Sequence, residues 1–172
     1  MTSGSHTDIT HQATEDSPRR SLRLRLKPKA PPTGYVDGAW WPRSRELTDE
    51  LAALTDVLAI RLGPVIRVAF ASTAWNPVTE VDGQPIRLVT LRPQEKHIVR
   101  VSGSDGRRIT LLVVPPEAAT EAGRDAVILA ARRANSDGPA DILAAAGVVS
   151  VAAHQNTHST LRPRLRTRRP QR

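Results

Sequence analysis

The stretch 44–64, SRELTDELAALTDVLAIRLGP, sets the architecture that we expect for this chain of 172 residues. Its leucines recur at steps of three and four residues, which places them on one stripe of an α-helix. The leucines of this stripe are Leu47, Leu51, Leu54, Leu58 and Leu62. Ser44 is a residue type that caps a first helical turn, and Gly63 followed by Pro64 typically ends a helix. Such a helix must pack its stripe against an apolar surface elsewhere in the chain.

The segments on both sides of this helix alternate apolar and polar residues, which is the pattern of half-buried strands. Strands are expected over residues 21–27, 65–71, 85–89, 97–102 and 108–114. In the strand 65–71, Ile66 is expected on the buried face. Asp82-Gly83 and the stretch 103–106 are hairpin-type turn signals. Residues 111–114 are apolar on both faces, so the last strand is expected to be central.

The C-terminal part of the folded region reads as helical. Residues 120–134 and 139–146 predict two further helices, and residues 148–153 fit either a helix extension or a short strand. Hairpin connections favour antiparallel neighbours with the helices packed on one side. We therefore predict an α+β fold, namely a two-layer domain with a mainly antiparallel sheet of about five strands and two or three helices on one face. The place of the first strand in the sheet cannot be read from the chain.

The net charge of +8 is concentrated at the C-terminal end. Residues 154–172 contain six arginines and no acidic residue, whereas residues 1–20 sum to −1. Both segments have few large apolar side chains, so we expect them to be disordered. The predicted organisation is a disordered segment 1–20, a single α+β domain 21–153 and a disordered Arg-rich tail 154–172.

Several classes of protein are excluded by what the sequence lacks. There is no cysteine, which excludes a disulfide framework, a thiolate metal site and a cysteine nucleophile. There is no apolar run long enough for a membrane span and no signal peptide, so a cytoplasmic protein is expected. Phosphate-binding loops, dinucleotide fingerprints and nucleophile elbows are also missing. We expect no metal and no cofactor, and we predict a non-enzymatic domain; Asp37 and Glu46 would be the candidates for acid–base chemistry.

The connection 28–43, PKAPPTGYVDGAWWPR, is unusually long for a compact domain. Aromatic rings, a carboxylate and guanidinium groups gather in it and at the start of the following helix. With a further tryptophan, the residues of this candidate ligand site are Tyr35, Asp37, Trp40, Trp41, Arg43, Arg45 and Trp75. Flat apolar walls and cations beside a helix N-terminus suit a small planar or anionic ligand. The alternative is that the tryptophans cap the core while Asp37 pairs with Arg43 or Arg45.

The strand phase opposite to the helices carries cations, which suggests a second candidate site. The cations of this phase are Arg23, Arg25, Lys27, Arg67, Arg87 and Arg100. The tail adds Arg162, Arg164, Arg166, Arg168 and Arg169. Together they predict, as an alternative function, binding of nucleic acid or another polyanion, without sequence preference where the tail is concerned. An ordinary solvated sheet face would show the same phase, and these strands lack the stacking aromatics of RNA-binding sheets.

Four segments carry a resemblance to a known family. They are residues 24–28, the block PPTGYVDGAWWPRSREL at 31–47, residues 109–116 and residues 131–135. On these segments, the chain from about residue 21 to 143 resembles an uncharacterised family of small actinobacterial domains. The resemblance implies kinship and a bacterial cytoplasm, but no activity, cofactor or partner. The Arg-rich tail lies outside the matched region.

Overall fold

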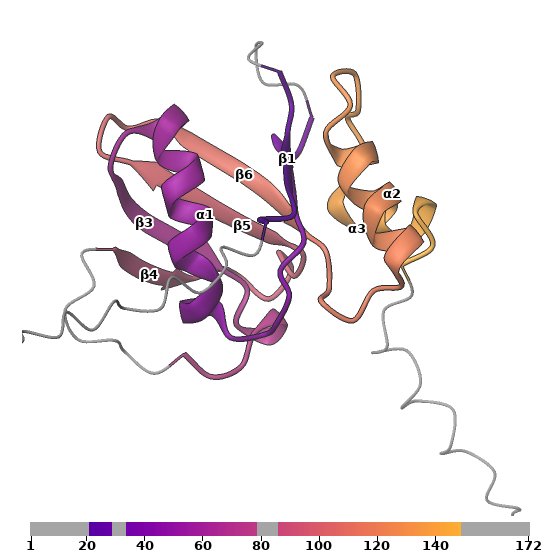
Figure 1. The fold of residues 1–172 in the computed structure, drawn as a ribbon, viewed down its shortest axis with the longest axis horizontal. Helices are drawn as coiled ribbons and strands as arrows, with labels where there is room; N and C mark the ends of the chain where they lie inside the picture. The colour runs from indigo at the N-terminus through magenta and orange to yellow at the C-terminus, as the bar shows by residue number, and fades with distance from the viewer. Residues whose placement is uncertain (1–20, 29–33, 79–85, 149–172) are drawn as a thin grey trace, which may run out of the picture.

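The computed structural model describes residues 21–28, 34–78 and 86–148 and confirms an α+β fold (Figure 1). Within these ranges, three helices flank one six-stranded sheet. The elements in chain order are β1 Leu24–Leu26, β2 Gly38–Trp40, α1 Leu47–Leu62, β3 Val65–Phe70, the 3₁₀ turn η1 Ser72–Ala74, β4 Arg87–Thr90, β5 Ile98–Gly103, β6 Arg108–Val113, α2 Thr120–Ala130 and α3 Pro139–Ala145. None of these helices combines the length and the apolar character that crossing a membrane requires.

The sheet is mixed, with the strand order β1-β2-β6-β5-β3-β4. The pairs β1–β2, β5–β6 and β3–β5 are antiparallel, whereas β2–β6 and β3–β4 are parallel. The expected hairpin between β3 and β4 is therefore wrong. The chain between Phe70 and Arg87 is long enough for the crossover that parallel neighbours need. The turn signal Asp82-Gly83 lies outside the described residues. The central position of β6 and its hairpin with β5 are confirmed.

The long connection 28–43 contains a strand, β2, which the sequence pattern does not reveal. This strand lies between β1 and β6, and all three of its residues are buried. Gly and Ala are poor strand formers, and three residues are too few to show alternation. A Cβ at Gly38 would lie 2.2 Å from the carbonyl oxygen of Arg25, so the close approach of β1 requires glycine there. The sheet thus has six strands, not about five.

The helices cover two faces of the sheet, so the prediction of one covered face is wrong. Consecutive residues of β6 show this directly, because Leu111 belongs to the core under α1 and Leu112 to the core with α2 and α3. Trp40 and Trp41 are divided between the same two cores. Figure 1 shows α1 lying across β3 and β5, with α2 and α3 beyond β1. A strand that is apolar on both faces needs cover on both, which explains the arrangement.

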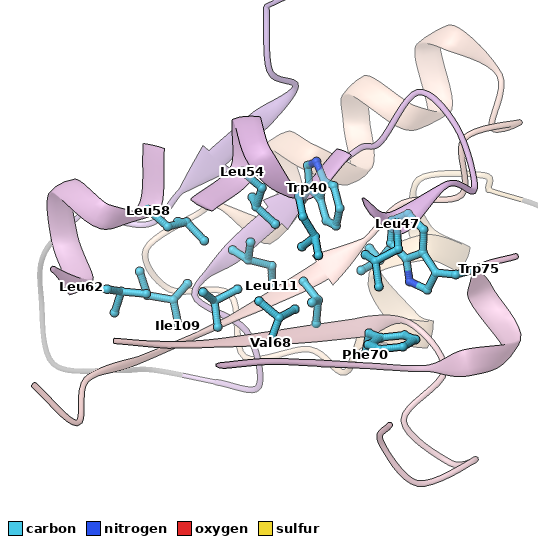
Figure 2. Close-up of a cluster of buried hydrophobic side chains, with 14 residues drawn as sticks. Trp40, Leu47, Leu54, Leu58, Leu62, Val68, Phe70, Trp75, Ile109 and Leu111 are labelled. Atoms are coloured by element: carbon cyan, nitrogen blue, oxygen red, sulfur yellow. The ribbon is translucent and has the colours of Figure 1, made fainter. Parts of the chain in front are cut away.

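The leucine stripe of α1 packs against the inner residues of the strands, as the helical spacing predicts (Figure 2). The helix ends at Gly63, whose φ is 66°, also as expected. In β3, a register shift between Val65 and Arg67 leaves Ile66 as an extra residue. Ile66 is 48% exposed, so its predicted place on the buried face is wrong. A bulge of this kind bends the strand and turns the extra residue out of the ladder.

Candidate anion-binding face

The three tryptophans of the expected ligand site are packed inside the protein. Trp40 is 0% and Trp75 6% exposed, and their rings stack with centroids 5.2 Å apart in the core under α1 (Figure 2). The indole nitrogens of both residues are buried without a hydrogen-bond partner. Trp41 is buried in the core on the other face. The three rings therefore do not line one common surface.

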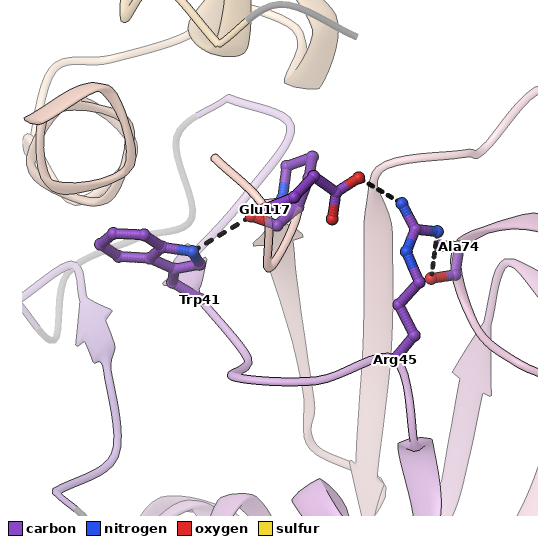
Figure 3. Close-up of polar contacts among 5 residues, drawn as sticks. Trp41, Arg45, Ala74 and Glu117 are labelled. Carbon is purple, nitrogen blue, oxygen red and sulfur yellow. Dashed lines mark hydrogen bonds and ion pairs between the residues drawn. The ribbon is translucent and has the colours of Figure 1, made fainter. Parts of the chain in front are cut away.

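Trp41 contacts three parts of the chain, namely Arg23 beside β1, Pro115 before α2, and Gly123 within α2. The guanidinium of Arg23 lies 3.7 Å from the centroid of the Trp41 ring and donates a hydrogen bond of 3.0 Å to the Trp41 carbonyl. The indole nitrogen of Trp41 donates to the carbonyl of Pro115 at 3.1 Å (Figure 3). A Cβ at Gly123 would lie 2.5 Å from the ring, so α2 packs directly on it. Burial, and then the nearby charge of Arg43, lower the pKa of Arg23. These contacts give Arg23 and Trp41 a packing role.

Arg43 and Arg45, the two arginines of the expected ligand site, have separate partners. Arg43 donates to the carbonyl of Ser21 at 3.1 Å. Arg45 pairs with Glu117 and donates to the carbonyl of Ala74 at 3.2 Å (Figure 3).

Asp37 exchanges hydrogen bonds with β6. Its carboxylate accepts from the amide of Thr110 at 2.7 Å, and its own amide donates to the Thr110 carbonyl at 2.7 Å. The alternative in which Asp37 pairs with Arg43 or Arg45 is therefore wrong. Glu46, the other carboxylate considered for acid–base chemistry, accepts a hydrogen bond from the side chain of Asn76.

The amides in front of α1 are occupied by a carboxylate of the chain itself. The side chain of Glu50 accepts from the amides of Arg43 and Ser44, each at 3.0 Å, and from the Ser44 hydroxyl at 3.1 Å. The helix begins at Leu47, and its N-cap residue Glu46 makes no side-chain cap. The Ser44 hydroxyl accepts a hydrogen bond of 3.2 Å from the amide of Glu46, but Ser44 lies two residues before this N-cap residue, so the prediction that Ser44 caps the first turn is wrong. An external anion at these amides would have to displace Glu50.

Strand register gathers arginines on the face turned away from α1. Arg87 of β4 lies opposite Arg67 of β3, Arg67 lies opposite Ser102 of β5, and Ser102 lies opposite Arg108 of β6. Directly opposite residues share a face, and neighbouring strands are about 4.8 Å apart. We call these four residues, Arg87, Arg67, Ser102 and Arg108, the arginine row. Arg108 was missed as a site residue, although its alternation with Ile109 places it in the polar phase.

The cations of the arginine row are exposed. Arg67, Arg87 and Arg108 are each exposed, and none of them takes part in an ion pair within the described ranges. Arg100 lies in the next row of the same face, opposite Ala69 and Thr110. It is half-buried and forms an ion pair with Glu95. The open part of this face thus carries Arg67, Arg87 and Arg108, which form no ion pair in the described ranges, and Arg100, which pairs with Glu95.

Two further cations of the predicted face, Arg25 of β1 and Lys27 just after it, lie on the side of the sheet near α2 and α3. Lys27 is 8% exposed, and its ammonium donates to the carbonyl of Asn135 at 2.8 Å. Burial lowers the pKa of Lys27, and the charge of Asp37 opposes this. Arg25 is exposed and lies opposite Ala39, which is buried in the core with α2 and α3. The two helices therefore separate the β1 cations from the arginine row.

Two further predictions concern metals and the tail. Among the residues that the structure describes, no three histidines or carboxylates gather into a group that could hold a metal ion. The tail arginines, Arg162, Arg164, Arg166, Arg168 and Arg169, lie outside the described residues.

No curated protein and no solved structure matches the chain. Residues 23–130, well over half of the chain, match the model of a family of unknown function (DUF5994), and the chain therefore belongs to this family.

Proposed function

We propose that the open half of the sheet binds an anionic polymer through the arginine row. The observation that carries this proposal is the register of Arg87, Arg67 and Arg108, which lie on one row with no carboxylate paired to them in the described ranges. Guanidinium groups present rigid pairs of donors that match phosphate and carboxylate groups. A row of them on flat strands suits a ligand with repeated negative charges.

The pairing of Arg67 with Arg87 supports the same proposal on energetic grounds. Like charges that lie directly opposite each other on neighbouring strands destabilise a sheet. A solvated face needs only polar side chains, and residues of opposite sign would satisfy that need at lower cost. An anion bound between the two guanidinium groups would offset their repulsion.

The Trp-rich connection is less well supported as a ligand site. Its tryptophans are buried, its backbone donors hold Glu50, and Arg45 is paired with Glu117. These contacts support a packing role, which the sequence left open as the alternative.

The experiment measures binding of the full chain to a fluorescein-labelled single-stranded oligonucleotide and to linear polyphosphate over a range of salt concentrations. The double variant Arg67→Gln/Arg87→Gln removes two of the row's three charges. We expect its affinity to fall on the order of tenfold at low salt, since two exposed contacts of about 0.7 kcal/mol each are lost. The slope of log affinity against log salt should become shallower by about 1.4.

Two matched controls identify the surface that binds. Arg124→Gln/Arg132→Gln makes the same change of charge at two exposed positions in and just after α2. A second full-length variant tests whether the charge of the tail causes the binding. It has glutamine in place of Arg162, Arg164, Arg166, Arg168 and Arg169. Binding that survives the row variant and disappears in the tail variant would show that the sheet face is not the binder.

A further inference from the structure

The outer side of α1 carries a second stripe of residues, opposite to the leucine stripe that packs on the sheet. Its members recur at steps of four, three and four residues, namely Asp49, Ala53, Asp56 and Ile60. All four are exposed, and Ile60 is 84% exposed, more than any other large apolar side chain of the described ranges. Val57, beside this stripe, is 40% exposed. We call these five residues the outer stripe.

The carboxylates of the outer stripe are available to a partner. Neither Asp49 nor Asp56 forms an ion pair or a hydrogen bond with the described part of the chain. The cations at the end of the helix are engaged elsewhere. Arg61 is half-buried and donates to the carbonyl of Lys27 at 3.0 Å, and Arg107 pairs with Asp105 at 3.2 Å. The outer stripe therefore combines negative charge with apolar side chains that lie in solvent.

A surface of this composition suits a segment that offers cations and apolar side chains together, because complementary charges select and align partners. Residues 161–166, LRPRLR, have this composition. They belong to the Arg-rich tail, which lies outside the described residues. Leu161 and Leu165 are the large apolar residues of the tail, and three arginines accompany them without any acidic residue.

The chain is long enough to bring this segment to α1. Leu161 follows Val148, the last described residue, by 13 residues, which span up to about 45 Å when extended. A domain of this size has a radius of gyration of about 14 Å and is roughly 36 Å across. Figure 1 shows α1 and α3 on the two sides of β1, which is an edge strand of the sheet. The tail has only to pass this edge.

From the exposed stripe, its charge and the reach of the chain, we infer that residues 161–166 dock on the outer stripe of the same molecule. The arginines of the segment pair with Asp49 and Asp56, and its leucines cover Val57 and Ile60. The arginine row lies on the face turned away from α1, so docking leaves that row open. The inference does not rest on the proposed function.

The test uses a nitroxide label on the tail of the full-length protein. The chain contains no cysteine, so Thr167→Cys gives a single labelling position next to the segment. In isotope-labelled protein, the nitroxide should broaden the amide signals of α1 around Asp56 and Ile60. Raising the salt from about 0.1 M to about 1 M shortens the Debye length from about 10 Å to about 3 Å and should remove most of this broadening.

Two variants of the outer stripe should weaken docking in the labelled protein. Asp49→Asn/Asp56→Asn should lower the ratio of docked to free tail about fivefold, because two exposed ion pairs are lost. Ile60→Ser removes the most exposed apolar side chain and should lower the ratio about threefold. The matched control is Glu121→Gln/Asp125→Asn, which makes the same change of charge at two exposed positions of α2. It should leave the broadening of α1 unchanged.

Each contrary result has a definite meaning. Sharp α1 signals in the labelled protein overturn the inference, as does broadening that survives Asp49→Asn/Asp56→Asn or falls equally in the α2 variant. A mixture detects docking between copies, because one protein carries the nitroxide and the other carries the isotope. If α1 is broadened as strongly in this mixture as within one chain, the stripe binds the tail of a second copy and docking within one molecule is overturned.

Discussion

The face of the sheet under α1 and the face turned away from it are built by the same strands, yet they have different roles. The first is apolar and is covered by the leucine stripe of α1. The second is divided, because α2 and α3 cover the part around Ala39 and Leu112 while the arginine row lies on the part that they leave open. The comparison shows that strand phase alone does not distinguish a structural cation from an available one. What distinguishes Arg23 from Arg67 is that Arg23 packs on the Trp41 ring and bonds to the Trp41 carbonyl, whereas Arg67 stays exposed.

The largest loss of stability is expected from a substitution in the core under α1. Trp40→Ala removes a side chain that is 0% exposed and stacked on Trp75, so the free energy of unfolding should fall by about 3–5 kcal/mol. Urea denaturation measures this change. Ile60→Ala is the control on the outer side of α1, and it should stay within about 0.5 kcal/mol of the parent. Equal losses in the two variants would contradict the packing described for this face.

An intermediate effect on stability should distinguish a cation that is packed, Arg23, from a cation that is exposed, Arg67. Arg23→Gln removes the contact with the Trp41 ring and a carbonyl hydrogen bond, so stability should fall by about 1–3 kcal/mol. Arg67→Gln removes a charge opposite Arg87, so stability should stay the same or rise by about 0.5 kcal/mol. Any rise should disappear at high salt, where exposed charges are screened. A loss at Arg67 as large as that at Arg23 would show that the row is structural.

The smallest effect on stability concerns His97, the residue just before β5. Burial, and then the charge of Lys96, lower the pKa of His97 below its ordinary value of 6.5. Just below that value the unfolded chain binds a proton at this site that the folded chain does not, so stability falls as the pH falls through this window. His97→Gln should lower the slope of unfolding free energy against pH by at most about 1.4 kcal/mol per pH unit. Urea denaturation of both proteins at several pH values between about 5 and 7 checks this. An unchanged slope would show that the pKa of His97 is not lowered in the folded protein.

Local patterns predicted a large part of this molecule. The helix stripe, the stop at Gly63, the β5–β6 hairpin and the phase of Arg67, Arg87 and Arg100 follow from spacing along the chain. The expected kinship with an uncharacterised family is confirmed by the match over residues 23–130. The short strand β2 and the parallel pairs were missed, because three buried residues carry no period and a crossover leaves no local mark.

The candidate site, too, was predicted only in part from local patterns. Arg67, Arg87 and Arg100 were expected on one face, but the place of Arg108 in the arginine row depends on how β6 pairs with β5. The role of Glu50 in front of α1 and the bond from Asp37 to Thr110 also join residues that the chain pattern does not connect.

The sequence by itself predicted most helices and strands and the strand phase that carries the cations. It could do so because the period of the side chains depends only on neighbouring residues. Which of those cations remain in solvent was settled in three dimensions, where α2 packs on Trp41 while Arg67, Arg87 and Arg108 stay exposed. That outcome rests on contacts between residues far apart in the chain, such as Gly123 with Trp41, and no local period encodes them.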